Sequence, residues 1–189
     1  MLNGVRMAPL VRMRGLGLKR TEQTMALSLR ESLHLVADPR NLDASVDEVF
    51  RLMLGVQCQR EPDSTQMQIP ADAESVTAVV GFGGLLSGAC VVRMTAEAAR
   101  MVAGVMTGIE FAEVDDTVKD GIGEICNMLA GTWKGKVPDL AANCGLSVPA
   151  VITGRDYNLH VQAPEFQLVH TFCFAGRCFS VTIVCDGLQ

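Results

Sequence analysis

Residues 114–136 read VDDTVKDGIGEICNMLAGTWKGK and predict a long, two-faced helix. Apolar side chains recur at the i, i+4, i+7 and i+11 spacing of a core-facing stripe, namely Val118, Ile122, Ile125 and Leu129. Polar side chains gather on the opposite face, within about 80° of one another by helical geometry. They are Asp116, Asp120, Glu124, Asn127 and Lys134. Asp115 or Asp116 as N-cap and Pro138 as a stop complete the pattern.

Two features of this helix are unusual for a surface helix. Gly121, Gly123 and Gly131 each cost roughly 1 kcal/mol relative to alanine in a helix interior. They are explained if another backbone or a partner protein must come close, and Gly131 lies on the polar face itself. On that face Glu124 and Asn127 lie one turn apart, where a carboxylate can bind a cation and a carboxamide can position a water. An ordinary solvated helix face is the alternative interpretation.

Composition limits the class of protein. A chain of 189 residues with 49% apolar residues is long enough for one domain with a full core. No apolar run approaches the roughly 18–20 residues of a membrane span, so we expect no membrane insertion. A net charge of −5 with few aromatic residues argues against nucleic acid as a partner. His34, His160 and His170 show no metal-ligand spacing, so we expect no structural zinc site.

Other residues with reactive side chains are predicted to be structural. The seven cysteines are odd in number and contain no Cys-x-x-Cys pair, which is typical of reduced, mostly buried thiols in a cytosolic protein. We therefore expect a cytoplasmic location. Cys126 is predicted to be a buried thiol, because no histidine on the helix is placed to activate it. His160 and His170 are predicted to be ordinary strand residues, and Trp133 to belong to the core.

The first 24 residues differ from the rest of the chain. They carry five basic residues and one acidic residue, and they lack the apolar segment and cleavage site of a signal peptide. We predict that residues 1–25 form a disordered basic arm, or an upstream extension if translation begins at Met7, Met13 or Met25. Residues 26–189 then form the folded domain.

The remaining patterns alternate helices with hairpins. Periodicity and capping signals predict a short helix at 26–37, a helix from a Ser45–Glu48 capping box to Gly55, and a helix at 95–107. Alternating apolar residues predict strands at 76–82, 85–94, 146–152, 157–161, 166–174 and 178–185, and residues 57–73 read as a loop. About four helices and six strands joined by hairpins indicate an α+β fold, a mostly antiparallel sheet with helices packed on one face.

One motif runs along the polar face of the long helix. It reads Asp120-x-x-x-Glu124-x-x-Asn127-Met-Leu-x-Gly131-x-x-Lys134 and is followed by Pro149 at a predicted strand start. This pattern resembles the CheC/CheX/FliY phosphatases of bacterial chemotaxis. The resemblance is closest to CheX, which has one such helix per chain where CheC has two, and the helices at 45–56 and 95–107 contain no second Glu-x-x-Asn. It extends in the order of elements from about residue 45 to the C-terminus.

The resemblance implies a phosphatase that removes the phosphoryl group from the aspartate of a CheY-type response regulator. Asn127 is then expected to hold the attacking water, and Glu124 to pair with the regulator's active-site lysine. Asp120, Gly131 and Lys134 are expected partner contacts. The acyl phosphate and its Mg²⁺ belong to the regulator, so the chain is expected to bind no metal or cofactor of its own. The resemblance also leads us to expect a homodimer paired through sheet edges.

A non-catalytic function of the same fold remains as the alternative. Flagellar-switch proteins with this fold dock partners without this catalysis, so the domain could bind a response regulator without turning it over. The presence of both Glu124 and Asn127 favours the enzyme. A hydrolase for a small metabolite has little support, because the sequence contains no recognisable nucleophile–base pair.

Overall fold

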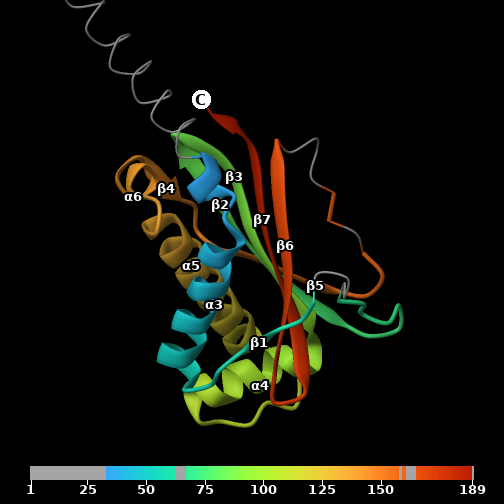
Figure 1. Cartoon of the computed structure of the whole chain (residues 1–189). Coiled ribbons are helices and arrows are strands. Elements are labelled where there is room, and N and C mark those ends of the chain that lie inside the picture. Colours follow the sequence, from blue (N-terminus) through green and yellow to red (C-terminus); the bar gives the residue numbers. More distant parts are fainter. Residues whose placement is uncertain (1–32, 63–66, 158, 161–164, 189) are drawn as a thin grey trace, which may run out of the picture.

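The computed structural model describes residues 33–62, 67–157, 159–160 and 165–188. A seven-stranded antiparallel sheet carries the helices on one of its faces (Figure 1). The helices are α2 (Leu33–Val36), α3 (Pro39–Leu54), α4 (Ala96–Thr107), α5 (Asp116–Gly135) and α6 (Pro138–Asn143). The strands are β1 (Gln59–Arg60), β2 (Ser75–Gly84), β3 (Leu86–Thr95), β4 (Cys144–Leu146), β5 (Ala150–Gly154), β6 (Phe166–Phe174) and β7 (Arg177–Leu188). The predicted α+β class is confirmed.

The strand order β1-β6-β7-β3-β2-β4 follows from two hairpins lying side by side. One hairpin joins β2 to β3 and the other joins β6 to β7, and β7 pairs with β3 to make the sheet continuous. The outer edge of β2 pairs with two short strands, β4 near its end and β5 near its beginning. Residues 144–154 therefore follow β2 in the antiparallel direction, with a break between Leu146 and Ala150.

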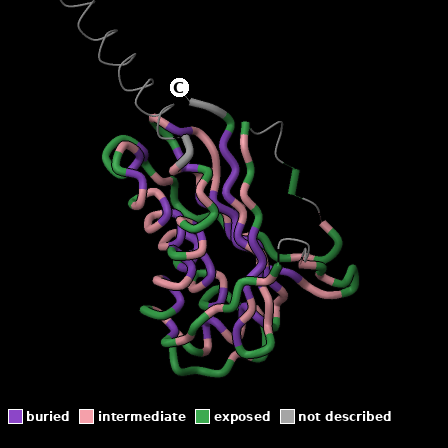
Figure 2. The backbone as a smooth tube through the Cα atoms, viewed as in Figure 1, coloured by how far each residue is buried: buried purple, intermediate pink, exposed green. Residues whose placement is uncertain are grey.

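The core lies between the sheet and the helices, where the buried residues of Figure 2 gather. The apolar stripe of α5 is buried as predicted, and Trp133 packs against Phe82 with 5.2 Å between ring centroids. On the other side of the core, Phe50 of α3 stacks on Phe179 of β7 at 4.6 Å. Because α5 packs on β2, β3, α3 and α4, its polar face is left on the outside.

The beginning of α3 differs from the prediction. The helix begins at Pro39, and the side chain of Asp38 accepts the N-cap hydrogen bond from the backbone N–H of Arg40. Ser45 lies buried inside the helix, where its hydroxyl donates to the carbonyl of Asn41. The Ser45–Glu48 capping box is therefore wrong, because Asp38 followed by Pro39 supplies a stronger start signal about two turns earlier.

The predicted loop at 57–73 and two of the predicted strands also differ from what the structure shows. The predicted loop at 57–73 contains the two-residue strand β1, which is too short to show an alternating pattern. Pro138 does end α5, but it also begins α6 as its first residue, a position where its missing N–H is not needed. The predicted strand at 146–152 is divided by Ser147–Pro149 into β4 and β5. Of the predicted strand at 157–161, the described residues are not in a strand.

The prediction of seven reduced cysteines is wrong for one pair. Cys173 and Cys178 lie opposite each other in the β6–β7 hairpin and form a disulfide. Among the other five, Cys126 is buried as predicted, and its thiol lies 3.5 Å from the carbonyls of Ala78 and Cys90. Burial, together with the nearby carboxylate of Asp47, raises the pKa of the Cys58 thiol to about 12.

Two predictions concern the N-terminal part of the chain, of which the structure describes residues from Leu33 onward. The basic arm at 1–25 and the first part of the predicted helix at 26–37 lie outside the described residues, whereas α2 accounts for the end of that helix. Within the described part of the chain, no helix is long and apolar enough to cross a membrane.

Candidate functional site

Helix α5 begins and ends with clear local signals. The side chain of Asp115 accepts a hydrogen bond from the backbone N–H of Val118 at 2.9 Å, which satisfies one of the free donors of the first turn. Asp116 forms an ion pair with Lys119 at 2.9 Å, and this hydrogen bond lowers the pKa of the Asp116 carboxyl and raises the pKa of the Lys119 amine. The prediction of an acidic N-cap is thus correct, and Asp115 fills the position.

The polar face of α5 presents two carboxylates and one amide. Asp120 and Glu124 are exposed, and Asn127, one turn further on, is half-buried. Within the described residues, the side chains of Glu124 and Asn127 make no hydrogen bond or ion pair with another residue. Both groups are therefore available to a ligand from outside, and the spacing places them on adjacent turns of one helix face.

The three glycines of α5 allow two other parts of the chain to approach the helix. A Cβ atom added at Gly121 would lie 3.7 Å from the side chain of Ala103 in α4. One added at Gly123 would lie 3.3 Å from the ring of Pro149, and one at Gly131 would lie 3.8 Å from Leu146. The close approach expected at these glycines comes from the chain itself, through side-chain atoms of α4 and of the 144–149 segment, which lies along α5.

Lys134 lies further along the helix and is engaged within the chain. Its ammonium donates to the backbone carbonyls of Ala141 at 3.1 Å and Cys144 at 2.7 Å, at the end of α6 and the start of β4. A cation at the C-terminal end of a short helix is favourable because the last carbonyls lack partners. In the free chain Lys134 thus fixes the start of the 144–149 segment, and its expected contact with a partner remains a prediction.

A cluster of charged residues that sequence analysis missed lies at the opposite edge of the sheet. His170 of β6 is buried, and its Nδ1 lies 2.8 Å from a carboxylate oxygen of Asp43. Its Nε2 lies 3.1 Å from a guanidinium nitrogen of Arg60, which in turn bonds Asp43 at 3.0 Å. Arginine can only donate, so Nε2 accepts and Nδ1 carries the proton that is donated to Asp43. His170 is thus not an ordinary strand residue, and alternation along β6 alone could not reveal its partners on α3 and β1.

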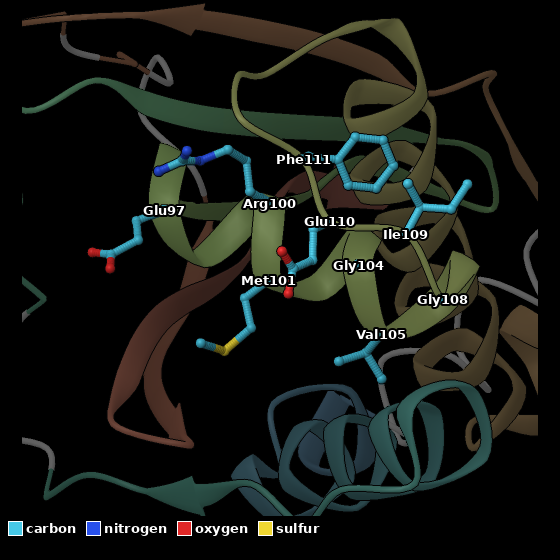
Figure 3. Close-up of a pocket in the computed structure, with 9 residues that line it drawn as sticks. All are labelled: Glu97, Arg100, Met101, Gly104, Val105, Gly108, Ile109, Glu110 and Phe111. Atoms are coloured by element: carbon cyan, nitrogen blue, oxygen red, sulfur yellow. The ribbon is translucent and has the colours of Figure 1, made fainter.

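A cavity of about 540 Å³ lies beside α4, away from the polar face of α5 (Figure 3). It is lined by Glu97, Arg100, Met101, Gly104, Val105, Gly108, Ile109, Glu110 and Phe111. Two of its charged side chains are already engaged, since Glu97 pairs with Arg177 and Arg100 donates to the carbonyl of Ala112. The candidate residues of α5 do not line this cavity, so the candidate site is an open helix face.

Nowhere in the described part of the chain do three His, Cys, Asp or Glu side chains come together in a group that could hold a metal ion. Asp120 and Glu124 lie one turn apart on an exposed face, and two exposed carboxylates fall short of the six or so oxygen ligands of Mg²⁺.

The chain is similar in sequence and in structure to proteins described as CheX. The family model described as "Chemotaxis phosphatase CheX" matches residues 76–173. The CheY-P phosphatase CheX of Thermotoga maritima is 31% identical over 119 residues, which cover 62% of this chain and 76% of that protein. The chemotaxis protein CheX of Vibrio vulnificus has a TM-score of 0.65 at 18% identity, covering 79% of this chain and 97% of its own. A chain of the CheX–CheY–BeF₃–Mg²⁺ complex from Borrelia burgdorferi has a TM-score of 0.63 at 22% identity, covering 78% and 97%.

Proposed function

This chain belongs to the CheX family of chemotaxis phosphatases, and from that premise we propose that it hydrolyses the aspartyl phosphate of a CheY-type response regulator. Phosphatase activity is supported at the level of the family by the relative from Thermotoga maritima. The observation that carries the proposal is the pair on α5, an exposed Glu124 and a half-buried Asn127 whose side chains have no partner within the described chain.

Asn127 acts on the attacking water. Hydrolysis of an acyl phosphate proceeds by in-line attack, and catalysis consists largely of positioning and electrostatic stabilisation. The side-chain amide of Asn127 can accept a hydrogen bond from the water and donate one to a phosphoryl oxygen, and it brings no charge toward the phosphate. Asn127 is half-buried, and this limits the directions in which its amide can point.

Glu124 fixes the docking of the regulator. Its carboxylate lies one turn before Asn127 and pairs with the active-site lysine of the regulator, so that the phosphoryl group arrives opposite the amide. Asp120, one turn before Glu124 and also exposed, and Gly131, one turn after Asn127, extend the contact along the same helix face. The Mg²⁺ that supports the reaction is carried by the regulator, where it neutralises charge on the phosphoryl oxygens.

The cellular setting is part of the proposal. We place the protein in the cytoplasm, where response regulators are phosphorylated, and we propose that it forms a homodimer through an open edge of its sheet. The edge formed by β5 is available for such pairing, since β2 is its one partner strand among the residues that the structure describes.

Decay of a phosphorylated receiver tests the proposal directly. A CheY-type receiver from the same genome is phosphorylated, and its decay is followed alone, with the protein and with Asn127→Ala. We expect faster decay with the wild type only and nearly equal binding of both proteins, because the variant loses the holder of the water but keeps the interface. Binding without faster decay would instead establish the non-catalytic binding module. A large loss of melting temperature in Asn127→Ala would show that the side chain is structural.

A further inference from the structure

The segment between β4 and β5 lies antiparallel along α5, opposite the turn that carries Asn127. Leu146 lies over Gly131 and Pro149 lies over Gly123, as shown by the distances from a Cβ atom added at each glycine. The two glycines are eight residues apart, which is about 12 Å along a helix. Three steps of extended chain span about 10–11 Å, so the segment from Leu146 to Pro149 covers the same length.

Asn127 lies at the midpoint of this contact. Positions 123, 127 and 131 are four residues apart and share one face of the helix. The middle of the segment, Ser147 and Val148, therefore passes the turn that carries Asn127. This placement accounts for the difference in exposure between Asn127, which is half-buried, and Glu124, which is exposed.

Hydrogen bonds to β2 fix the direction of Ser147. The hydroxyl of Ser147 accepts from the backbone N–H of Gly81 at 2.9 Å and donates to the carbonyl of Val148 at 2.9 Å. The backbone N–H of Ser147 donates to the carbonyl of Gly81 at 3.0 Å. The next residue, Val148, is 85% exposed, so its side chain lies on the outer surface of this segment.

We propose that Val148 is a specificity-determining residue that contacts the receiver domain when its aspartyl phosphate reaches Asn127. The proposal rests on the function proposed above. A receiver that brings its phosphoryl group to Asn127 must come within reach of the side chain held at the same level of α5. Covering this exposed valine with apolar atoms of the receiver would lower the free energy of the complex, so the proposed contact is an apolar one. Ser147 acts as a positioning residue, because its bonds to Gly81 hold Val148 in this position.

Steady-state kinetics of the full chain separates this role from catalysis. Val148→Ser removes the apolar contact, and we expect the KM for the phosphorylated receiver to rise about tenfold with kcat unchanged, because burying one valine side chain is worth about that factor in affinity. Val169→Ser is the matched control. Val169 is also exposed, at 47%, but it lies on β6, on the sheet face opposite the helices, and its KM and kcat should equal those of the wild type.

Two further measurements decide between the remaining interpretations. Sedimentation velocity shows whether Val148→Ser changes the association of the protein with itself. An unchanged KM, or a raised KM accompanied by a change in self-association, overturns the proposal, since Val148 would then face solvent or a second copy. If the wild type binds the phosphorylated receiver without accelerating its decay, the proposed phosphatase fails, but a tenfold weaker binding of Val148→Ser still supports the contact. Absence of wild-type binding overturns both.

Discussion

The close approach of Pro149 to α5 leads to a prediction about two neighbouring glycines of the same helix. Gly121→Ala places a Cβ atom 3.7 Å from Ala103, which is ordinary contact, so the helix should gain roughly 1 kcal/mol of stability. Gly123→Ala places its Cβ atom 3.3 Å from Pro149 and 3.4 Å from Val151, closer than most such contacts. Overpacking costs about 1–3 kcal/mol, so the same gain should be cancelled or exceeded, with a net loss between zero and about 2 kcal/mol.

The two variants can be compared by equilibrium unfolding. Trp133 is the single tryptophan of the chain and is buried against the sheet, so its fluorescence reports on the packing of α5 directly. For a chain of this length, roughly 1 kcal/mol corresponds to about 2–4 °C in melting temperature, which is readily measured. In the phosphatase assay, Gly123→Ala should raise the KM for the receiver, because a displaced Pro149 moves Val148, whereas Gly121→Ala should leave it unchanged.

Equal stabilisation by the two substitutions would refute the reasoning. It would mean that the 144–149 segment either lies further from α5 than the contacts indicate or moves away without cost. In that case the segment could not hold Val148 at the level of Asn127. A loss of stability in Gly121→Ala alone would show that α4, and not this segment, approaches α5 more closely.

Two other predictions concern charge and the disulfide. Glu124→Ala should lower both receiver affinity and turnover, by roughly 2 kcal/mol or about thirtyfold in affinity, because it leaves the regulator's lysine unpaired; titration calorimetry at low and high salt checks this, and the loss should shrink as salt is raised. Cys178→Ser opens the bond to Cys173, and the short loop that this bond closes is worth about 2 kcal/mol of unfolding free energy. Dithiothreitol should therefore lower the melting temperature of the wild type but not of Cys178→Ser, and an equal shift in both would contradict a disulfide in solution. The reduced domain should stay folded, because a loss of about 2 kcal/mol is smaller than the roughly 5–15 kcal/mol by which folded domains are usually stable.

Local periodicity made α5 and most of the sheet predictable. The apolar stripe from Val118 to Leu129, the acidic N-cap and the alternation in the hairpins each depend on residues within a few positions of one another. The start of α3 was predicted wrongly, because two helix-start signals lie close together in the sequence. The Ser45–Glu48 spacing fits a capping box, but Asp38 followed by Pro39 offers both a cap and a preset first helical residue, and the helix begins there.

The disulfide was within reach of the sequence but was missed. The predicted strands at 166–174 and 178–185 require a turn between them, and a two-residue turn at Ala175-Gly176 places Phe174 opposite Arg177 and Cys173 opposite Cys178. Both turn residues have positive φ, as tight hairpin turns require. The prediction of reduced thiols relied on the odd number of cysteines alone. The register of the β6–β7 hairpin decides which two cysteines lie opposite each other.

What the sequence could not supply is the identity of the segment that approaches each glycine of the central helix. Three glycines remove roughly 3 kcal/mol of helix propensity from α5, and helical periodicity cannot tell which distant residues occupy the space. In the structure, α4 approaches Gly121, and the 144–149 segment approaches Gly123 and Gly131. These two glycines lie four residues before and four residues after Asn127. If hydrolysis depends chiefly on positioning, the amide that holds the water needs rigid surroundings. The 144–149 segment supplies them, because Ser147 is hydrogen-bonded to Gly81 of β2 and Cys144 is hydrogen-bonded to Lys134 of α5. The glycines therefore lower the intrinsic stability of the helix at the positions where rigidity beside Asn127 matters most.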